Sequence, residues 1–243
     1  MMNEGREDHS ASGAKRRVYP GLAFGSRATL RLQWPIAAAC VGFFAATVYV
    51  PLLLPGGSLR ALWFHGCVLA GALFLAFARG WNRRALGLVW RPQPSLSYWL
   101  YASGWGLLIC VVGFLITIEF SRHGSDVFGL CETELPSTNG SILSFVLRAS
   151  IEEELLFRFF LCGALLGYVS MGANIAINGV VFALVHIVLG GIGPDSVVAG
   201  FILAWAFLRS GSIVVPIAMH AAGNGLLFVV YHAELFRSLA CKQ

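Results

Sequence analysis

The stretch Ser150-Ile-Glu-Glu-Glu-Leu-Leu-Phe-Arg158 decides the fold of this chain. It places three carboxylates and a guanidinium inside a largely apolar run from Ile142 to Tyr168. A helix of about 20 apolar residues is long enough to cross a bilayer. Charged side chains are costly at that depth, so they usually face a protein interior or a wet cavity and mark function. The stretch therefore predicts a transmembrane helix that carries a functional site.

The spacing of the charges separates paired side chains from one unpaired carboxylate. Glu154 and Arg158 are four residues apart with the acid first, which is the better order for an ion pair on one helix face. Arg148 and Glu152 repeat that spacing. Glu153 has no charged residue four positions away. Because an unpaired carboxylate in a dry environment is a candidate acid or base, Glu153 is the first candidate catalytic residue.

The composition indicates a membrane protein. Of the 243 residues, 57% are hydrophobic and only 12% are charged, whereas a soluble domain carries about 25% charged residues. The net charge is +5, but the arginines flank apolar runs instead of forming one stripe, so we expect no binding to nucleic acid. The first apolar run is too long for the core of a signal peptide, which predicts an uncleaved first helix.

Seven segments are candidates for membrane spans. They cover about 34–54, 59–78, 97–118, the run around the glutamates, 172–189, 196–208 and 212–232. Every backbone group needs an internal partner in lipid, so the spans must be helical. We therefore predict an all-α, polytopic membrane bundle of about seven transmembrane helices. Arginine-rich segments alternate with an acid-rich loop at 119–140, which predicts a cytoplasmic N-terminus.

Two later spans carry polar pairs at a spacing of four residues. Phe182 and His186 share one helix face, and so do His220 and Asn224. A carboxylate can take a proton from water, and a histidine can help to polarise that water or protonate a leaving amine. A second histidine and an amide can donate hydrogen bonds to a developing oxyanion. Together with Glu153, these side chains are the parts needed for hydrolysis.

Three motifs in this order resemble those of the CPBP family of CAAX-processing and bacteriocin-processing intramembrane endopeptidases. That family is related to the type II CAAX prenyl endopeptidase and to lysostaphin resistance protein A. The motifs are Glu153-Glu154-x-x-x-Arg158, Phe182-x-x-x-His186 and His220-x-x-x-Asn224. The alternative register Glu152-Glu153 would put Phe157 where the arginine belongs. The resemblance covers about residues 142–231.

The resemblance implies a role for each motif residue. Glu153 activates water together with His186, while His220 and Asn224 form an oxyanion hole. Glu154 completes the catalytic set, and Arg158 and Phe182 support it. The chain then divides into a basic cytoplasmic tail (1–33), a variable transmembrane region (34–140), a protease core (141–233) and a C-terminal tail (234–243). His65 has no polar partner at a helical spacing and is interpreted as a structural or interfacial residue.

The predicted function is endopeptidase cleavage near the C-terminus or membrane segment of a protein or peptide precursor. The expected partners are that substrate and the lipid bilayer. The sequence leaves two substrate classes open, which are prenylated CAAX tails in a eukaryote and peptide precursors or sorting tails in a bacterium. For a bacterial protein, the expected location is the inner membrane. One alternative is a non-proteolytic scaffold or immunity protein of the same fold. Another is a transporter with a proton relay, although no inverted repeat is evident.

No cofactor is expected, and zinc is the alternative. Glu153, His186 and His220 would then be its ligands, because a catalytic zinc usually has three protein ligands and a water. The chain contains no His-Glu-x-x-His motif. Zinc would itself polarise the substrate carbonyl, so the second carboxylate and Asn224 favour a metal-free site.

Overall fold

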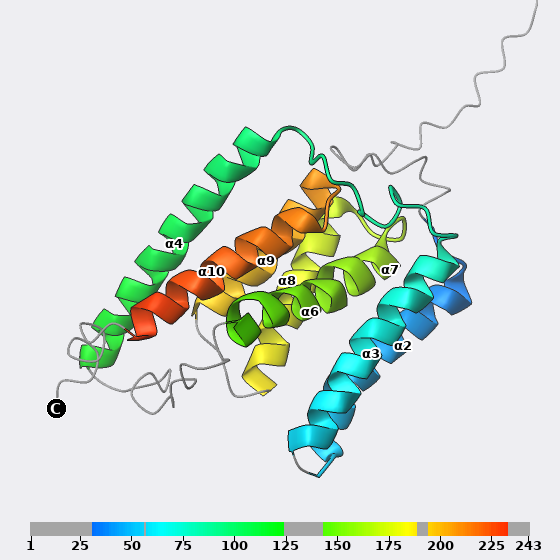
Figure 1. Cartoon of the computed structure of the whole chain (residues 1–243), viewed down its shortest axis with the longest axis horizontal. Helices are drawn as coiled ribbons and strands as arrows, with labels where there is room; N and C mark the ends of the chain where they lie inside the picture. Colours follow the sequence, from blue (N-terminus) through cyan, green and yellow to red (C-terminus); the bar gives the residue numbers. More distant parts are fainter. Residues whose placement is uncertain (1–30, 56, 124–142, 189–193, 233–243) are drawn as a thin grey trace, which may run out of the picture.

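The computed structural model describes residues 31–55, 57–123, 143–188 and 194–232, and the regular structure in these ranges is helical (Figure 1). The elements are α2 (Trp34–Leu53), α3 (Gly57–Ala78), α4 (Leu96–His123), η1 (Leu143–Arg148), α6 (Ala149–Glu154), η2 (Leu155–Cys162), α7 (Gly163–Leu165), α8 (Met171–Val188), α9 (Pro194–Ser210) and α10 (Val214–His232). The elements from η1 to α7 follow one another without a break, and we call residues 143–165 the motif helix. The prediction of an all-α membrane bundle is confirmed for the described residues.

Four described helices are long and apolar enough to cross a membrane. They are α2, α3, the Leu96–Gly113 part of α4, and α8. Shorter apolar helices cover Ser196–Ser210 and Val214–Val229. The chain is therefore a multi-pass membrane protein. One predicted boundary is wrong, because the loop expected from residue 119 begins later and α4 continues to His123. The helix contains no proline, and no glycine follows Gly113 within it.

The helices α2 and α3 form an antiparallel hairpin on one side of the motif helix, and α4 lies on the far side of α10 (Figure 1). Aromatic rings join the hairpin to the motif helix, with centroids 5.4 Å apart for Phe44 and Phe157. The helices α8 and α9 cross where Gly179 and Gly200 lie close together. A Cβ atom on Gly200 would lie 2.9 Å from the carbonyl oxygen of Gly179, so this crossing requires a residue without a side chain.

The arginine-rich connection between α3 and α4 packs against the turn between α9 and α10. The amide of Gln93 donates to the carbonyl of Ser210, and the amide of Ile213 donates to that of Gly87. Arg79, just after α3, donates from Nη2 to the carbonyl of Gly163. Burial lowers the pKa of Arg79 to about 10, which still leaves it charged at neutral pH. The ends of several helices are thereby fixed at one end of the bundle.

The motif helix is not a uniform α-helix. The segments η1 and η2 are π-helical, and the α-helical segment α6 between them carries the three glutamates. Wide turns of this kind occur frequently at functional sites. A buried amide chain ties η2 to α8, because Asn174 donates to the carbonyl of Cys162 at 3.2 Å and Asn178 donates to the Asn174 side chain at 2.8 Å. The sequence predicted a helix here but not its widened turns.

Candidate active site

The ion pair predicted within the motif helix is present and buried. Arg158 Nη1 lies 3.2 Å from Glu154 Oε1, and neither side chain is exposed. Nη2 of the same guanidinium donates to the carbonyls of Gly200 at 3.2 Å and Ala199 at 3.5 Å. These contacts connect the motif helix to α9 close to the glycine crossing. Arg158 therefore compensates the charge of Glu154 and also fixes the position of a neighbouring helix.

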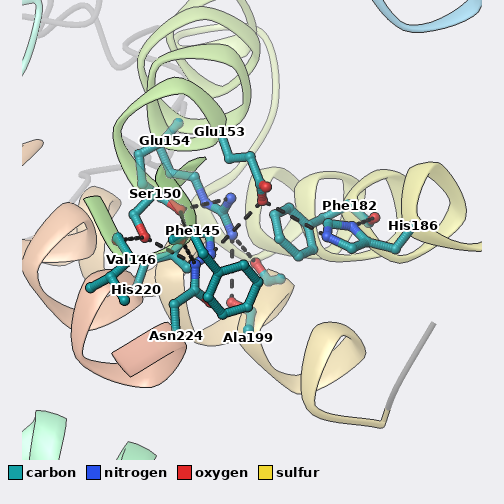
Figure 2. Close-up of polar contacts among 12 residues, drawn as sticks. Phe145, Val146, Ser150, Glu153, Glu154, Phe182, His186, Ala199, His220 and Asn224 are labelled. Atoms are coloured by element: carbon teal, nitrogen blue, oxygen red, sulfur yellow. Dashed lines mark hydrogen bonds and ion pairs between the residues drawn. The ribbon is translucent and has the colours of Figure 1, made fainter. Parts of the chain in front are cut away.

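Two side chains of α10 fasten that helix to the motif helix. His220 Nδ1 lies 2.8 Å from Glu154 Oε1, and it must donate because a carboxylate only accepts. One turn later, Asn224 Nδ2 donates to the carbonyl of Phe145 at 3.0 Å and to Ser150 Oγ at 3.2 Å (Figure 2). Both amide protons of Asn224 are thus used within the protein. An oxyanion contact from Asn224 would require one of these bonds to be exchanged.

Glu153 differs from Glu154 in both exposure and contacts. Its side chain is 25% exposed, whereas that of Glu154 is fully buried. Glu153 Oε2 lies 3.8 Å from His186 Nε2 and 3.8 Å from His220 Nε2 (Figure 2). This distance is too long for a direct hydrogen bond but suits a water molecule that bridges the two atoms. The two imidazole nitrogens therefore converge on one carboxylate oxygen, which is itself shielded from solvent.

The orientation of His186 is set by Phe182, one turn earlier on α8. His186 Nδ1 lies 2.9 Å from the Phe182 carbonyl oxygen, and since a carbonyl only accepts, Nδ1 carries the proton. Nε2 of the neutral ring is then an acceptor that faces Glu153. The two rings lie 4.3 Å apart, and the Arg158 guanidinium carbon lies 4.6 Å from the centroid of Phe182 on its other side. Phe182 is thereby held between the buried cation and the imidazole.

The structure brings all seven predicted site residues into one cluster, from the motif helix, α8 and α10. The sequence reasoning missed Ser150, which accepts from Asn224 and donates to the carbonyl of Val146 at 2.8 Å. Its place four residues before Glu154 was the available signal. The contacts of Arg158 with backbone carbonyls of α9 could not be predicted, because every residue has a backbone carbonyl.

His65, which the sequence indicates is structural or interfacial, has a polar partner on another helix that the sequence did not predict. His65 Nδ1 lies 2.9 Å from Glu152 Oε1, while Arg148, the predicted partner of Glu152, lies farther away with Nε at 3.9 Å. The reason is geometric, since a contact between α3 and α6 joins residues 87 positions apart and no local spacing reveals it.

No group of three or more His, Cys, Asp or Glu side chains in the described parts of the chain is arranged to hold a metal ion. The nearest approach to such a group is the set formed by Glu153, His186 and His220, with the two distances of 3.8 Å given above. The cluster as it stands is an arrangement of acids, bases and hydrogen-bond donors.

A membrane-embedded helical bundle whose buried carboxylates and histidines meet between helices has the class features of an intramembrane protease. Residues 136–226 match the family model described as type II CAAX prenyl endopeptidase Rce1-like. The matched region contains all three motifs, and the match supports the resemblance to the family of CAAX-type proteases. No curated protein and no solved structure gives a significant match to the chain.

Proposed function

We propose that this protein is an intramembrane endopeptidase in which Glu153 activates a water molecule for attack on a peptide bond. The observation that carries the proposal is the convergence of Glu153 Oε2 with the Nε2 atoms of His186 and His220, each 3.8 Å away. The match of residues 136–226 to a family of CAAX-type proteases supports it. The remaining contacts of the cluster supply a role for each neighbouring side chain.

In the first step, a water between Glu153 and His186 donates one hydrogen bond to each acceptor, which leaves an oxygen lone pair free for attack. Glu153 takes up a proton as the water oxygen bonds to the scissile carbonyl carbon. Glu154 is less suited to this role, because its side chain is fully buried and Arg158 and His220 contact its Oε1 at 3.2 Å and 2.8 Å. The difference in contacts between two adjacent carboxylates thus selects the base.

In the second step, the carbonyl oxygen becomes an oxyanion and needs donors. His220 can donate from Nε2 in its imidazolium form, with Glu154 holding Nδ1. Asn224 can contribute if its amide exchanges a bond within the protein for one to the oxyanion. Collapse of the intermediate breaks the C–N bond, and the proton held by Glu153 passes to the leaving amine. Every proton is then accounted for without a cofactor.

The substrate that we propose is a protein or peptide with a membrane-associated C-terminal region. Exposed apolar side chains of α8 (Ile177, Val180, Leu184 and Ile187) give the helix that carries His186 a surface suited to lipid. A substrate anchored in the bilayer can approach such a site by lateral diffusion. The cytoplasmic orientation of the N-terminus remains part of this proposal.

Glu153→Gln tests the assignment, because it keeps the size of the side chain and removes its basicity. We expect cleavage of a membrane-anchored precursor to fall by about 10²–10⁴-fold, with a comparable loss for His186→Ala and an unchanged amount of folded protein. Glu119→Gln, the same chemical change on α4, is the matched control. Cleavage near the wild-type rate by Glu153→Gln would refute the role of Glu153. A wild-type protein that cleaves no anchored precursor would favour the scaffold alternative.

One observation favours a second mechanism enough to test it. Both histidines present Nε2 to Glu153 while Nδ1 is held by an acceptor, which is how metal-binding histidines are oriented in zinc sites. We propose the metal-free mechanism because the site already contains separate base and donor groups. Activity should therefore survive extended dialysis against EDTA and a stronger zinc chelator. Loss of activity that added zinc restores would make His186, His220 and Glu153 ligands instead.

A further inference from the structure

A second contact between a carboxylate and an imidazole lies beside the candidate active site. His65 Nδ1 of α3 is 2.9 Å from Glu152 Oε1 of α6, and the two side chains are 34% and 20% exposed. The Nδ1 atom itself is shielded from solvent, and its approach to Glu152 is a close contact that is not aligned as a hydrogen bond. Arg148 approaches the same oxygen less closely, and its side chain is 60% exposed. A shielded nitrogen facing a carboxylate across two helices is a specific contact between them.

With this contact included, each of the three consecutive glutamates lies next to a histidine, and each histidine comes from a different helix. Glu152 meets His65 of α3, Glu153 faces His186 of α8, and Glu154 binds His220 of α10. Successive residues of an α-helix point about 100° apart, so the three carboxylates fan out around α6. The rotation of α6 about its axis is therefore fixed on both sides of Glu153.

Fixing Glu152 also has an electrostatic consequence. Two carboxylates at adjacent positions repel each other strongly where the dielectric constant is low. The contact with His65 holds the charge of Glu152 toward α3, on the side of the helix away from His186 and His220. Among the described residues, the charged groups that contact these glutamates include Arg148 and Arg158.

We propose that His65 is a positioning residue for the catalytic carboxylate, acting through Glu152. It sets the rotation of α6 so that Glu153 points between His186 and His220. This inference rests on the proposed function, and it extends the working parts of the enzyme to α3, outside the matched residues 136–226. The hairpin of α2 and α3 is thus part of the active-site support as well as of the membrane region.

His65→Ala tests the proposal with a quenched fluorescent peptide that ends in a farnesylated CAAX tail, presented in detergent micelles to the full-length protein. We expect kcat to fall about 3–30-fold with KM unchanged, which is the usual size of coupling between contacting residues. His65→Gln keeps a donor that reaches Glu152 and should recover much of the rate. Leu69→Ala, one turn along α3 at a side chain that is 61% exposed, should leave kcat unchanged.

The double variant separates positioning from general structural damage. If His65 acts through Glu152, then His65→Ala in a Glu152→Gln background should lower kcat no further. Effects that multiply, a normal kcat in His65→Ala, or an equal loss in Leu69→Ala would each overturn the proposal. The melting temperatures of the wild type, His65→Ala, Glu152→Gln and the double variant test the contact without any substrate. Purely additive changes in melting temperature would also overturn the proposal. If Glu153→Gln loses cleavage while His65→Ala cleaves at the wild-type rate, only this inference is refuted. If Glu153→Gln remains active, the proposed function is refuted.

Discussion

Replacing Arg158 with alanine should destabilise the bundle as well as stop cleavage. The guanidinium contacts Glu154 Oε1 at 3.2 Å, donates to the Gly200 carbonyl at 3.2 Å and lies 4.6 Å from the Phe182 ring centroid. Alanine removes all three contacts and leaves Glu154 buried with only the imidazole of His220 beside it. The perturbation therefore removes the guanidinium partner of a fully buried carboxylate.

The magnitude follows from that buried charge. Removing one partner of a buried ion pair costs about 3–5 kcal/mol, and this range already includes the desolvated charge left behind. The cation–π contact and the bonds to α9 belong to the same removal, so their energies are not added to it. For a chain of this length, about 1 kcal/mol shifts Tm by about 2–4 °C. We therefore expect a decrease in Tm of about 6–20 °C.

The assay is thermal unfolding in detergent, followed by cleavage at a temperature where the variant is folded. Arg148→Ala is the matched control, because Arg148 stands in the same spacing to Glu152 but is 60% exposed, and such a pair is worth about 0–1 kcal/mol. In the double variant Arg158→Ala/Glu154→Gln, Tm should recover relative to Arg158→Ala while cleavage stays low. A wild-type Tm in Arg158→Ala with cleavage abolished would refute the reasoning and indicate a direct catalytic role.

Three further predictions use other parts of the molecule. Asn224→Ala should lower cleavage about 10²–10³-fold if its amide reaches the oxyanion, and a rate near wild type would limit this residue to fastening α10. Gly200→Ala should lower Tm, since overpacking costs about 1–3 kcal/mol and the new Cβ would lie 2.9 Å from a backbone oxygen. Gly104→Ala, with nothing within 4 Å, is its control, and equal shifts would contradict the close crossing. In a cysteine-free background, an impermeant thiol reagent on intact cells should label a cysteine at Ser125 and not one at Asn82, and the reverse result would invert the orientation.

The parts of the fold that the sequence predicted are those governed by local rules. The spans are set by apolar length, so α2 begins at Trp34 and α8 ends at Val188, within a residue or two of the predicted limits. The pair between Glu154 and Arg158 follows from helical spacing alone. Local patterns therefore suffice for helices and for contacts within one helix.

The parts that the sequence could not predict depend on contacts between distant segments. The π-helical turns of the motif helix involve buried amides of α8, such as Asn174 bound to the carbonyl of Cys162. The contact of His65 with Glu152 needs α3 to lie against α6, and nothing at either position specifies that packing. The bonds from the Asn224 amide to Phe145 and Ser150 join α10 to the motif helix, and no local spacing reveals them.

The three adjacent glutamates show why burial alone does not identify a catalytic carboxylate. Glu154 is the most buried of them, yet its Oε1 is engaged by a guanidinium and an imidazole, so this carboxylate is poorly suited to accept a proton from water. Glu152 contacts an imidazole directly at 2.9 Å. Only Glu153 combines partial exposure with histidine nitrogens at 3.8 Å, which is near enough to share a water and too far to replace it. A base must be reachable by its substrate and still be oriented, and in the mechanism that we propose the neighbours on both sides of Glu153 supply the orientation.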